Sequence, residues 1–171
     1  MGEVRERRFK ADAFNIDNLH FLSWANGIQA DDHYWMLGTV RHGADEVPRV
    51  RLRTCSSTST LNATTGKLKA GACTLATATY DGLRMKLYKN SRLLGTGLRL
   101  GNIAENDQVP VWIGGNPDGK SGRPFPGTID EVAIFNKALT AGQIDSLYKA
   151  RQASVALVKW EKCENAGLLE T

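Results

Sequence analysis

The chain consists largely of short runs in which apolar and polar residues alternate, and turn residues bound each run. In Pro48–Thr54 the alternation is strict, because Val50 and Leu52 fall on one side of a strand and three arginines on the other. Asp81–Gly82, which separates two further runs, is a strong signal for a hairpin turn. Many such runs in one chain predict an all-β sandwich of two antiparallel sheets.

Further strands are predicted wherever the same period recurs. They are Ala13–Trp24, His33–Val40, a weak pair within Ser56–Gly71, Val109–Ile113 and Gly127–Phe135. The last run carries apolar residues on both faces, which predicts that both faces are covered. Residues 1–12 are rich in charge, and we expect them to be flexible or to form an edge segment.

One short helix is predicted directly after the last of these strands, over Thr140–Arg151. Thr140 and Gln143 match a capping box, and Leu139 is placed to pack on Ile144. A helix of about three turns is marginal by itself, so we expect it to dock on the sandwich.

Two blocks of sequence together resemble the laminin G-like and pentraxin branch of the concanavalin A-like lectin folds. The blocks are Ile113–Asn116 with Gly127–Asn136 and Ala138–Ile144, and Ala78–Gly82 with Arg84–Asn90. The resemblance implies a concanavalin A-like jelly roll, with the whole chain of 171 residues forming a single domain.

The segment after the helix, Val155–Gly167, alternates again and is predicted to be a strand. It resembles the strand with which many laminin G-like domains begin, and the N-terminus lacks such a strand. We therefore expect the C-terminal strand to occupy the place of the missing first strand. The alternative is that it begins a truncated second repeat.

Composition is that of an ordinary globular domain, with 42% hydrophobic and 23% charged residues and a net charge of +4. No apolar run reaches the ~20 residues of a membrane span, and no signal peptide is recognised at the N-terminus. Cys55, Cys73 and Cys163 show no metal-binding spacing. Reduced thiols, compatible with the cytoplasm, are expected, with a Cys55–Cys73 bridge as the alternative, although the family is often extracellular.

No catalytic constellation is recognised. Relatives that hydrolyse β-glucans on this fold carry a Glu-x-Asp-x-x-Glu strand motif, which this sequence lacks. The resemblance therefore favours a non-catalytic binding module for carbohydrate. A protein-interaction or adhesion domain on the same scaffold is the alternative, and a glycoside hydrolase is a third candidate.

The first candidate ligand site is basic. Its members are Arg49, Arg51 and Arg53 on one strand and Arg84, Lys86 and Tyr88 on another. If the two strands are neighbours in one sheet, these side chains form a cationic stripe suited to acidic or sulfated glycans or glycoproteins. The alternative is a solvated face whose charges prevent aggregation. Nucleic acid is not expected, because aromatic residues do not interleave with the stripe.

Calcium is the candidate metal, and two sites are considered for it. Asp130 shares a strand face with apolar residues, and a buried carboxylate needs a partner. The resemblance implies a structural calcium between Asp130 and Glu164. The alternative is that backbone N–H groups or an arginine satisfy Asp130.

The second calcium site lies in loops at one end of the sandwich, by resemblance to pentraxins. Its candidate ligands are Asp45, Glu46, Asn116 and Asp118. Loop carboxylates and carbonyl groups can supply the six to eight oxygens that calcium takes. Trp35 or Trp112 is the candidate stacking surface for a sugar, with a place in the core as the alternative.

Overall fold

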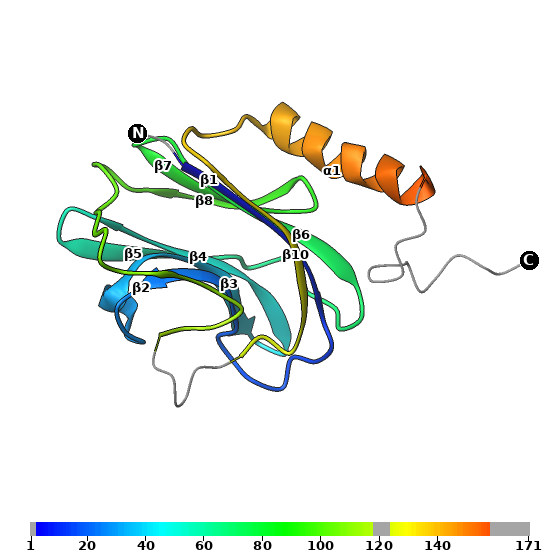
Figure 1. Cartoon of the computed structure of the whole chain (residues 1–171), viewed down its shortest axis with the longest axis horizontal. Helices are drawn as coiled ribbons and strands as arrows, with labels where there is room; N and C mark the ends of the chain where they lie inside the picture. Colours follow the sequence, from blue (N-terminus) through cyan, green and yellow to red (C-terminus); the bar gives the residue numbers. More distant parts are fainter. Residues whose placement is uncertain (1–2, 118–123, 158–171) are drawn as a thin grey trace, which may run out of the picture.

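The computed structural model describes residues 3–117 and 124–157, which form a sandwich of two antiparallel five-stranded sheets (Figure 1). One sheet has the strand order β10-β1-β6-β7-β8 and the other has β5-β4-β3-β2-β9. The predicted fold class is confirmed. The elements are β1 Glu3–Ala11, β2 His20–Ala25, the 3-10 helix η1 Ala30–Asp32, β3 His33–His42, β4 Asp45–Thr54, β5 Ser57–Asn62, β6 Cys73–Tyr80, β7 Arg84–Lys89, β8 Arg92–Leu98, β9 Val111–Ile113, β10 Gly127–Phe135 and α1 Ala141–Leu157.

The N-terminal segment is a central strand. Residues Glu3–Ala11 pair with β10 on one side and with β6 on the other, so the expectation that residues 1–12 are flexible or at an edge is wrong for this strand. Phe9 anchors it, because its ring stacks on that of Phe21 in the opposite sheet with centroids 3.9 Å apart. The local sequence pattern does not reveal a central strand here, because the strand is held by one buried aromatic residue and by backbone hydrogen bonds to two neighbouring strands.

The structure agrees with the predicted Asp81–Gly82 hairpin more closely than with the strands predicted from weaker alternation. Asp81–Gly82 lies between β6 and β7, which are paired neighbours. The strand expected over Ala13–Trp24 is confined to β2, and the weak pair within Ser56–Gly71 is reduced to β5. Val155–Leu157 belongs to α1, so the strand predicted there is wrong over these residues, and the rest of that segment lies outside the described residues.

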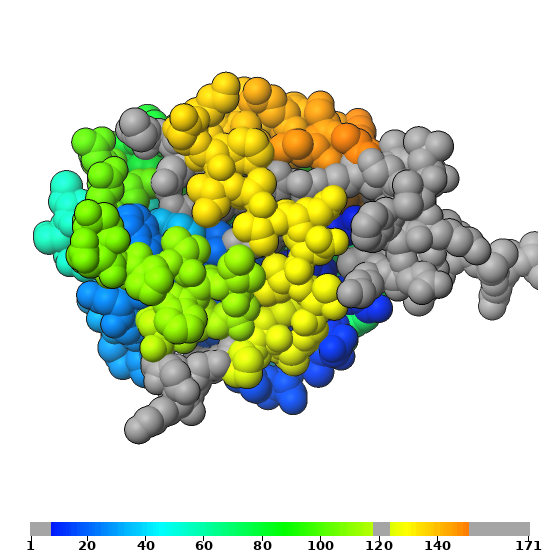
Figure 2. Space-filling model, in the orientation of Figure 1, coloured from blue at the N-terminus to red at the C-terminus, as the bar shows by residue number. Residues whose placement is uncertain are grey.

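The strand β10 is an edge strand with one apolar row in solvent. Val132 is 40% exposed and Ile134 48% exposed, so the prediction that both faces of this strand are covered is wrong. The register of β10 against β1 shifts near Glu131, whose φ is +50°. Figure 2 shows this strand, in yellow, beside the chain around β9, in green, on one face of the molecule.

The helix lies on the outer face of the β10-β1-β6-β7-β8 sheet (Figure 1). Its capping box is present, because the Gln143 backbone N–H donates to Thr140 Oγ1 at 3.2 Å and the Thr140 N–H donates to Gln143 Oε1 at 2.9 Å. Ile144 is fully buried against Leu139 and Tyr88. The helix extends beyond the predicted Arg151, to Leu157. In the described ranges, no helix is long and apolar enough to cross a membrane.

The capping box gives a stability prediction. Thr140→Ala removes the hydroxyl that accepts the Gln143 N–H, and we expect the free energy of unfolding to fall by about 1 kcal/mol. Urea unfolding followed by circular dichroism measures the change. Thr140→Ser keeps the hydroxyl and should retain most of the stability, and equal stability of both variants and the parent would contradict the role of the cap.

Candidate ligand-binding site

The two predicted basic strands lie in different sheets. Val50 and Leu52 of β4 face the core from one sheet, and Met85 and Leu87 of β7 face it from the other. The polar residues of β4 and β7 therefore project from opposite sides of the sandwich. The prediction that they form one continuous cationic stripe is therefore wrong.

The basic residues of β7 do not form a ligand site of their own. Lys86 Nζ lies 3.8 Å from a carboxylate oxygen of Asp81, and Arg84 is exposed beside it. Tyr88 is buried beneath α1 with Leu139 and Ile144. The side chain of Tyr88 is thus part of the helix-docking surface.

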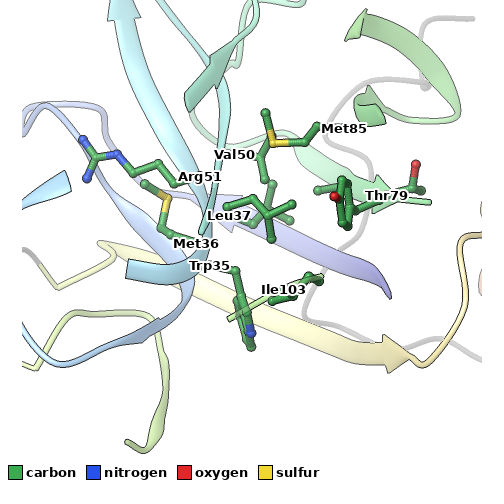
Figure 3. A pocket seen from close by; sticks show the side chains of 11 residues that line it. Trp35, Met36, Leu37, Val50, Arg51, Thr79, Met85 and Ile103 are labelled. Carbon is green, nitrogen blue, oxygen red and sulfur yellow. The ribbon is translucent and has the colours of Figure 1, made fainter. Parts of the chain in front are cut away.

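The arginines of β4 lie on the outer face of the β5-β4-β3-β2-β9 sheet. The ladder sets Arg51 opposite Met36 of β3, Met36 opposite Ser23 of β2, and Ser23 opposite Trp112 of β9. Figure 3 shows Arg51 and Met36 pointing away from the small cavity between the sheets. That cavity, of about 20 Å³, is lined chiefly by apolar residues and has room for about one water molecule, which is too little for a sugar.

Arg51 lies next to a buried histidine. Its Nη1 is 3.5 Å from Nδ1 of His33, a fully buried residue whose Nδ1 is 2.7 Å from the Gln29 carbonyl oxygen. Burial, and secondly the charge of Arg51, lower the pKa of His33 below its ordinary value. His33 is therefore neutral at pH 7, with Nδ1–H donating to Gln29. The ring of His20 packs on it edge to face, at 5.4 Å between centroids.

Arg53 is held by an aromatic ring and a carbonyl group. Its Cζ is 5.6 Å from the ring centroid of Tyr34, and its Nη1 donates to the Asp31 carbonyl oxygen at 3.2 Å. Tyr34 is fixed in turn, because its hydroxyl accepts a hydrogen bond from Asn106 Nδ2 at 2.9 Å. Among the residues that the structure describes, no carboxylate forms an ion pair with Arg53.

Arg49 has a structural position instead. It is only 4% exposed, and its Nη1 donates to Asn18 Oδ1 at 2.5 Å. Of the three arginines on β4, the half-buried Arg51 and Arg53 are the pair that reaches the surface.

The two candidate tryptophans differ in position. Trp35 is 4% exposed and belongs to the core, so it is not a stacking surface. Trp112 is 37% exposed on β9. Between Trp112 and Arg51, however, Met36 and Ser23 are buried, so Trp112 and the arginines occupy separate surfaces.

The described members of the loop calcium site are engaged elsewhere. Asp45 forms an ion pair with Lys67 at 2.5 Å, and Glu46 is buried and accepts a hydrogen bond from the Thr39 hydroxyl. Burial raises the pKa of Glu46. Asn116 Oδ1 accepts a hydrogen bond from the Ser23 hydroxyl at 2.9 Å. Asp118 lies outside the described residues.

The predicted structural calcium site at Asp130 loses its premise. Asp130 is exposed rather than buried, and its Oδ1 accepts the backbone N–H of Glu131 at 2.8 Å, while Glu164 lies outside the described residues. Over 3–117 and 124–157, no group of three His, Cys, Asp or Glu side chains is placed to hold a metal ion. Cys55 and Cys73 are free thiols, so the alternative bridge between them is wrong, and Cys163 lies outside this part of the chain.

Sequence reasoning missed the residues that lie beside the two arginines. His33, Tyr34 and the loop before them approach Arg51 and Arg53 through the pairing of β3 with β4. The sequence signal was present but incomplete: the aromatic start of the second strand and the arginine alternation of the third were both visible. Only the register brings them together.

The chain is similar to known proteins in its family and in its fold. The family model of the concanavalin A-like lectin/glucanases superfamily matches residues 10–145. A comparison with curated proteins gives no match. Many solved structures share the fold.

Three solved structures illustrate the range of similar proteins. The CBM40 domain of the Ruminococcus gnavus IT-sialidase, bound to α2,3-sialyllactose, has a TM-score of 0.70 at 19% identity and covers 86% of this chain and 82% of its own. A heptameric SAP-like pentraxin from Limulus polyphemus has a TM-score of 0.64 at 17% identity, covering 86% and 69%. Botulinum neurotoxin type C, described as interacting with two ganglioside molecules, has a TM-score of 0.57 at 14% identity, covering 87% and 35%. At these identities the likenesses establish the fold.

The buried His33 predicts a stability that depends on pH. Because its pKa is lowered in the folded state, the unfolded chain takes up a proton first as the pH falls below about 6.5, and acidification therefore destabilises the fold. We expect His33→Gln to lose less stability than the parent between about pH 7.5 and about pH 5 in chemical unfolding.

His42→Gln is the matched control, because His42 is exposed at the far end of the same strand. The raised pKa of Glu46 acts in the opposite sense and is common to all three proteins, so it cancels in the comparison. If the stability of His33→Gln depends on pH as strongly as that of the parent, His33 is not the group whose lowered pKa destabilises the fold in acid.

Proposed function

Because this chain belongs to the concanavalin A-like lectin/glucanases superfamily, we propose that it is a non-catalytic glycan-binding module whose ligand carries an acidic or sulfated group. The site is the pair Arg51 and Arg53 on the outer face of the β5-β4-β3-β2-β9 sheet. The observation that carries the proposal is the way Arg53 is fixed by Tyr34 and by the Asp31 carbonyl oxygen, which leaves its charge available to an anion.

The spacing of the two arginines suits one acidic group. Residues two apart on a strand project from the same face about 7 Å apart at Cα, and long side chains can converge from that distance on one carboxylate or sulfate. Guanidinium groups bind such anions through charge-assisted, often bidentate hydrogen bonds. The sialyllactose ligand of the CBM40 domain and the gangliosides of the neurotoxin are acidic glycans bound on the same fold, which supports this ligand class.

Protein binding is a second candidate, and one observation favours it. Val111 and Ile113 of β9 and Val132 and Ile134 of β10 are 40% to 60% exposed, on two edge strands that lie on one face of the molecule (Figure 2). Apolar side chains grouped at a surface are typical of interaction sites. A protein partner at this edge would leave the arginine pair unused, so the arginine variants below separate the two functions.

The binding prediction compares ligands that differ only in acidity. We expect sialyllactose to bind more tightly than lactose, and heparin more tightly than desulfated heparin. Arg51→Ala with Arg53→Ala should weaken binding of the acidic ligand about tenfold or more, since a hydrogen bond to a charged group contributes about 1.5–3 kcal/mol. Isothermal calorimetry measures the dissociation constants of the acidic and the neutral ligand for the parent and the variant. Binding of the acidic ligand to the parent should weaken when salt is added.

Arg84→Ala with Lys86→Ala is the matched control, because it removes the same charge from the opposite side of the sandwich. It should leave the affinity unchanged. Binding that survives the β4 double variant, or that both variants weaken equally, would refute the site.

Calcium dependence stays a prediction from the family resemblance. No group of three His, Cys, Asp or Glu side chains is placed to hold a metal ion in the described ranges, and the candidate ligands Asp118 and Glu164 lie outside them. Repeating the calorimetry with calcium and with EDTA tests it: equal affinities mean that the arginine site acts without calcium.

A further inference from the structure

A row of neutral polar side chains lies beside the arginines on the edge strand β5. The ladder sets Thr58 opposite Arg53, Thr60 opposite Arg51, and Asn62 opposite Arg49. Residues directly opposite in a ladder share a face, so this row lies on the same outer face as the arginines. Leu61, between Thr60 and Asn62, packs against the core, which confirms the direction of its neighbours.

The members of this row differ in accessibility. Thr60 and Asn62 are exposed, whereas Thr58 is half-buried and its hydroxyl donates to the His33 carbonyl oxygen at 3.4 Å. The strand Ser57–Asn62 carries no charged residue and lies at the edge of its sheet (Figure 1). It therefore offers a hydroxyl and an amide to a ligand without repelling an anion.

The opposite direction across the sheet is closed. Met36 and Ser23, the next residues along the row from Arg51, are 1% and 0% exposed. Beyond Arg53 along the strand, β4 ends at Thr54 and the chain turns. A ligand anchored on Arg51 and Arg53 thus finds exposed polar side chains along β4 and β5, at Thr60 and Asn62.

We propose that the site takes an acidic oligosaccharide of at least two sugar units that lies along β4 and β5. The acidic unit binds Arg51 and Arg53, and the hydroxyl groups of the next unit hydrogen-bond to Thr60 and Asn62. The Cα atoms of Thr60 and Asn62 are about 7 Å apart along the strand, a separation that a second sugar ring can span. This inference rests on the proposed function and assigns Thr60 and Asn62 as specificity-determining residues within it.

The test uses the full chain and two probes, sialyllactose and free sialic acid. Thr60→Val keeps the branched shape of the side chain and removes only the hydroxyl, and Asn62→Ala removes the amide. Each should weaken sialyllactose binding roughly three- to tenfold, as expected for a neutral hydrogen bond. Binding of free sialic acid should stay unchanged, because that ligand occupies the arginines alone.

Thr96→Val is the matched control. Thr96 is exposed on β8, the edge strand of the other sheet, where it stands opposite Lys86 as Thr60 stands opposite Arg51. Thermal unfolding of all variants checks that the fold is kept. Thr60→Ser, which restores the hydroxyl, should recover the affinity.

The outcomes separate this inference from the function on which it rests. If the Arg51→Ala, Arg53→Ala variant loses binding while Thr60→Val and Asn62→Ala bind sialyllactose like the parent, the orientation along β5 is wrong and the glycan site stands. Equal weakening of sialyllactose and free sialic acid by Thr60→Val also overturns the orientation. If sialyllactose does not bind the parent, heparin tetrasaccharide and inorganic sulfate replace the two probes, and failure of both pairs overturns the function and the inference together.

Discussion

The fold depends on the contact between Phe9 and Phe21, which joins the two sheets where the N-terminal strand enters the core. The stacked rings bury large apolar surfaces, and Phe125 meets both of them edge to face. This contact fixes which face of β1 points inward. Because side chains alternate along a strand, the same contact fixes the orientation of the ladder that β1 forms with β10 and β6. The helix packs on the outer face of the sheet that this ladder completes.

Much of the fold could be predicted from local pattern, because alternation and turn residues act over a few positions. The arginine alternation of β4, the Asp81–Gly82 turn and the capping box of α1 are all of this kind. The central strand β1 could not be found in this way, since its sequence is mostly charged and its place is set by pairing partners that lie more than sixty residues away. The exposure of Asp130 was missed for a related reason: the strand that carries it has a register shift and a free edge, which periodicity does not reveal.

The candidate site shows the same division between local and long-range information. That Arg51 and Arg53 project from one face followed from alternation, whereas their neighbours His33 and Tyr34 could be identified only from strand pairing. The sequence pattern also suggested one site shared by these arginines and the basic residues of β7, a strand that the topology places in the other sheet. Choosing among basic residues therefore required the fold, because a charge pattern says which side of a strand is polar and nothing about which sheet holds the strand.

The contact of Arg53 with Tyr34 has a consequence for the thermodynamics of binding. An arginine side chain that is free in solution loses about 2 kcal/mol of rotamer entropy when it is immobilised. Here much of that loss has already occurred on folding, because the ring of Tyr34 and the Asp31 carbonyl oxygen hold the guanidinium in place. A ligand that meets this arginine finds a receptor group already in position, so more of the interaction energy remains as affinity. The aromatic residue would then contribute to recognition without touching the ligand.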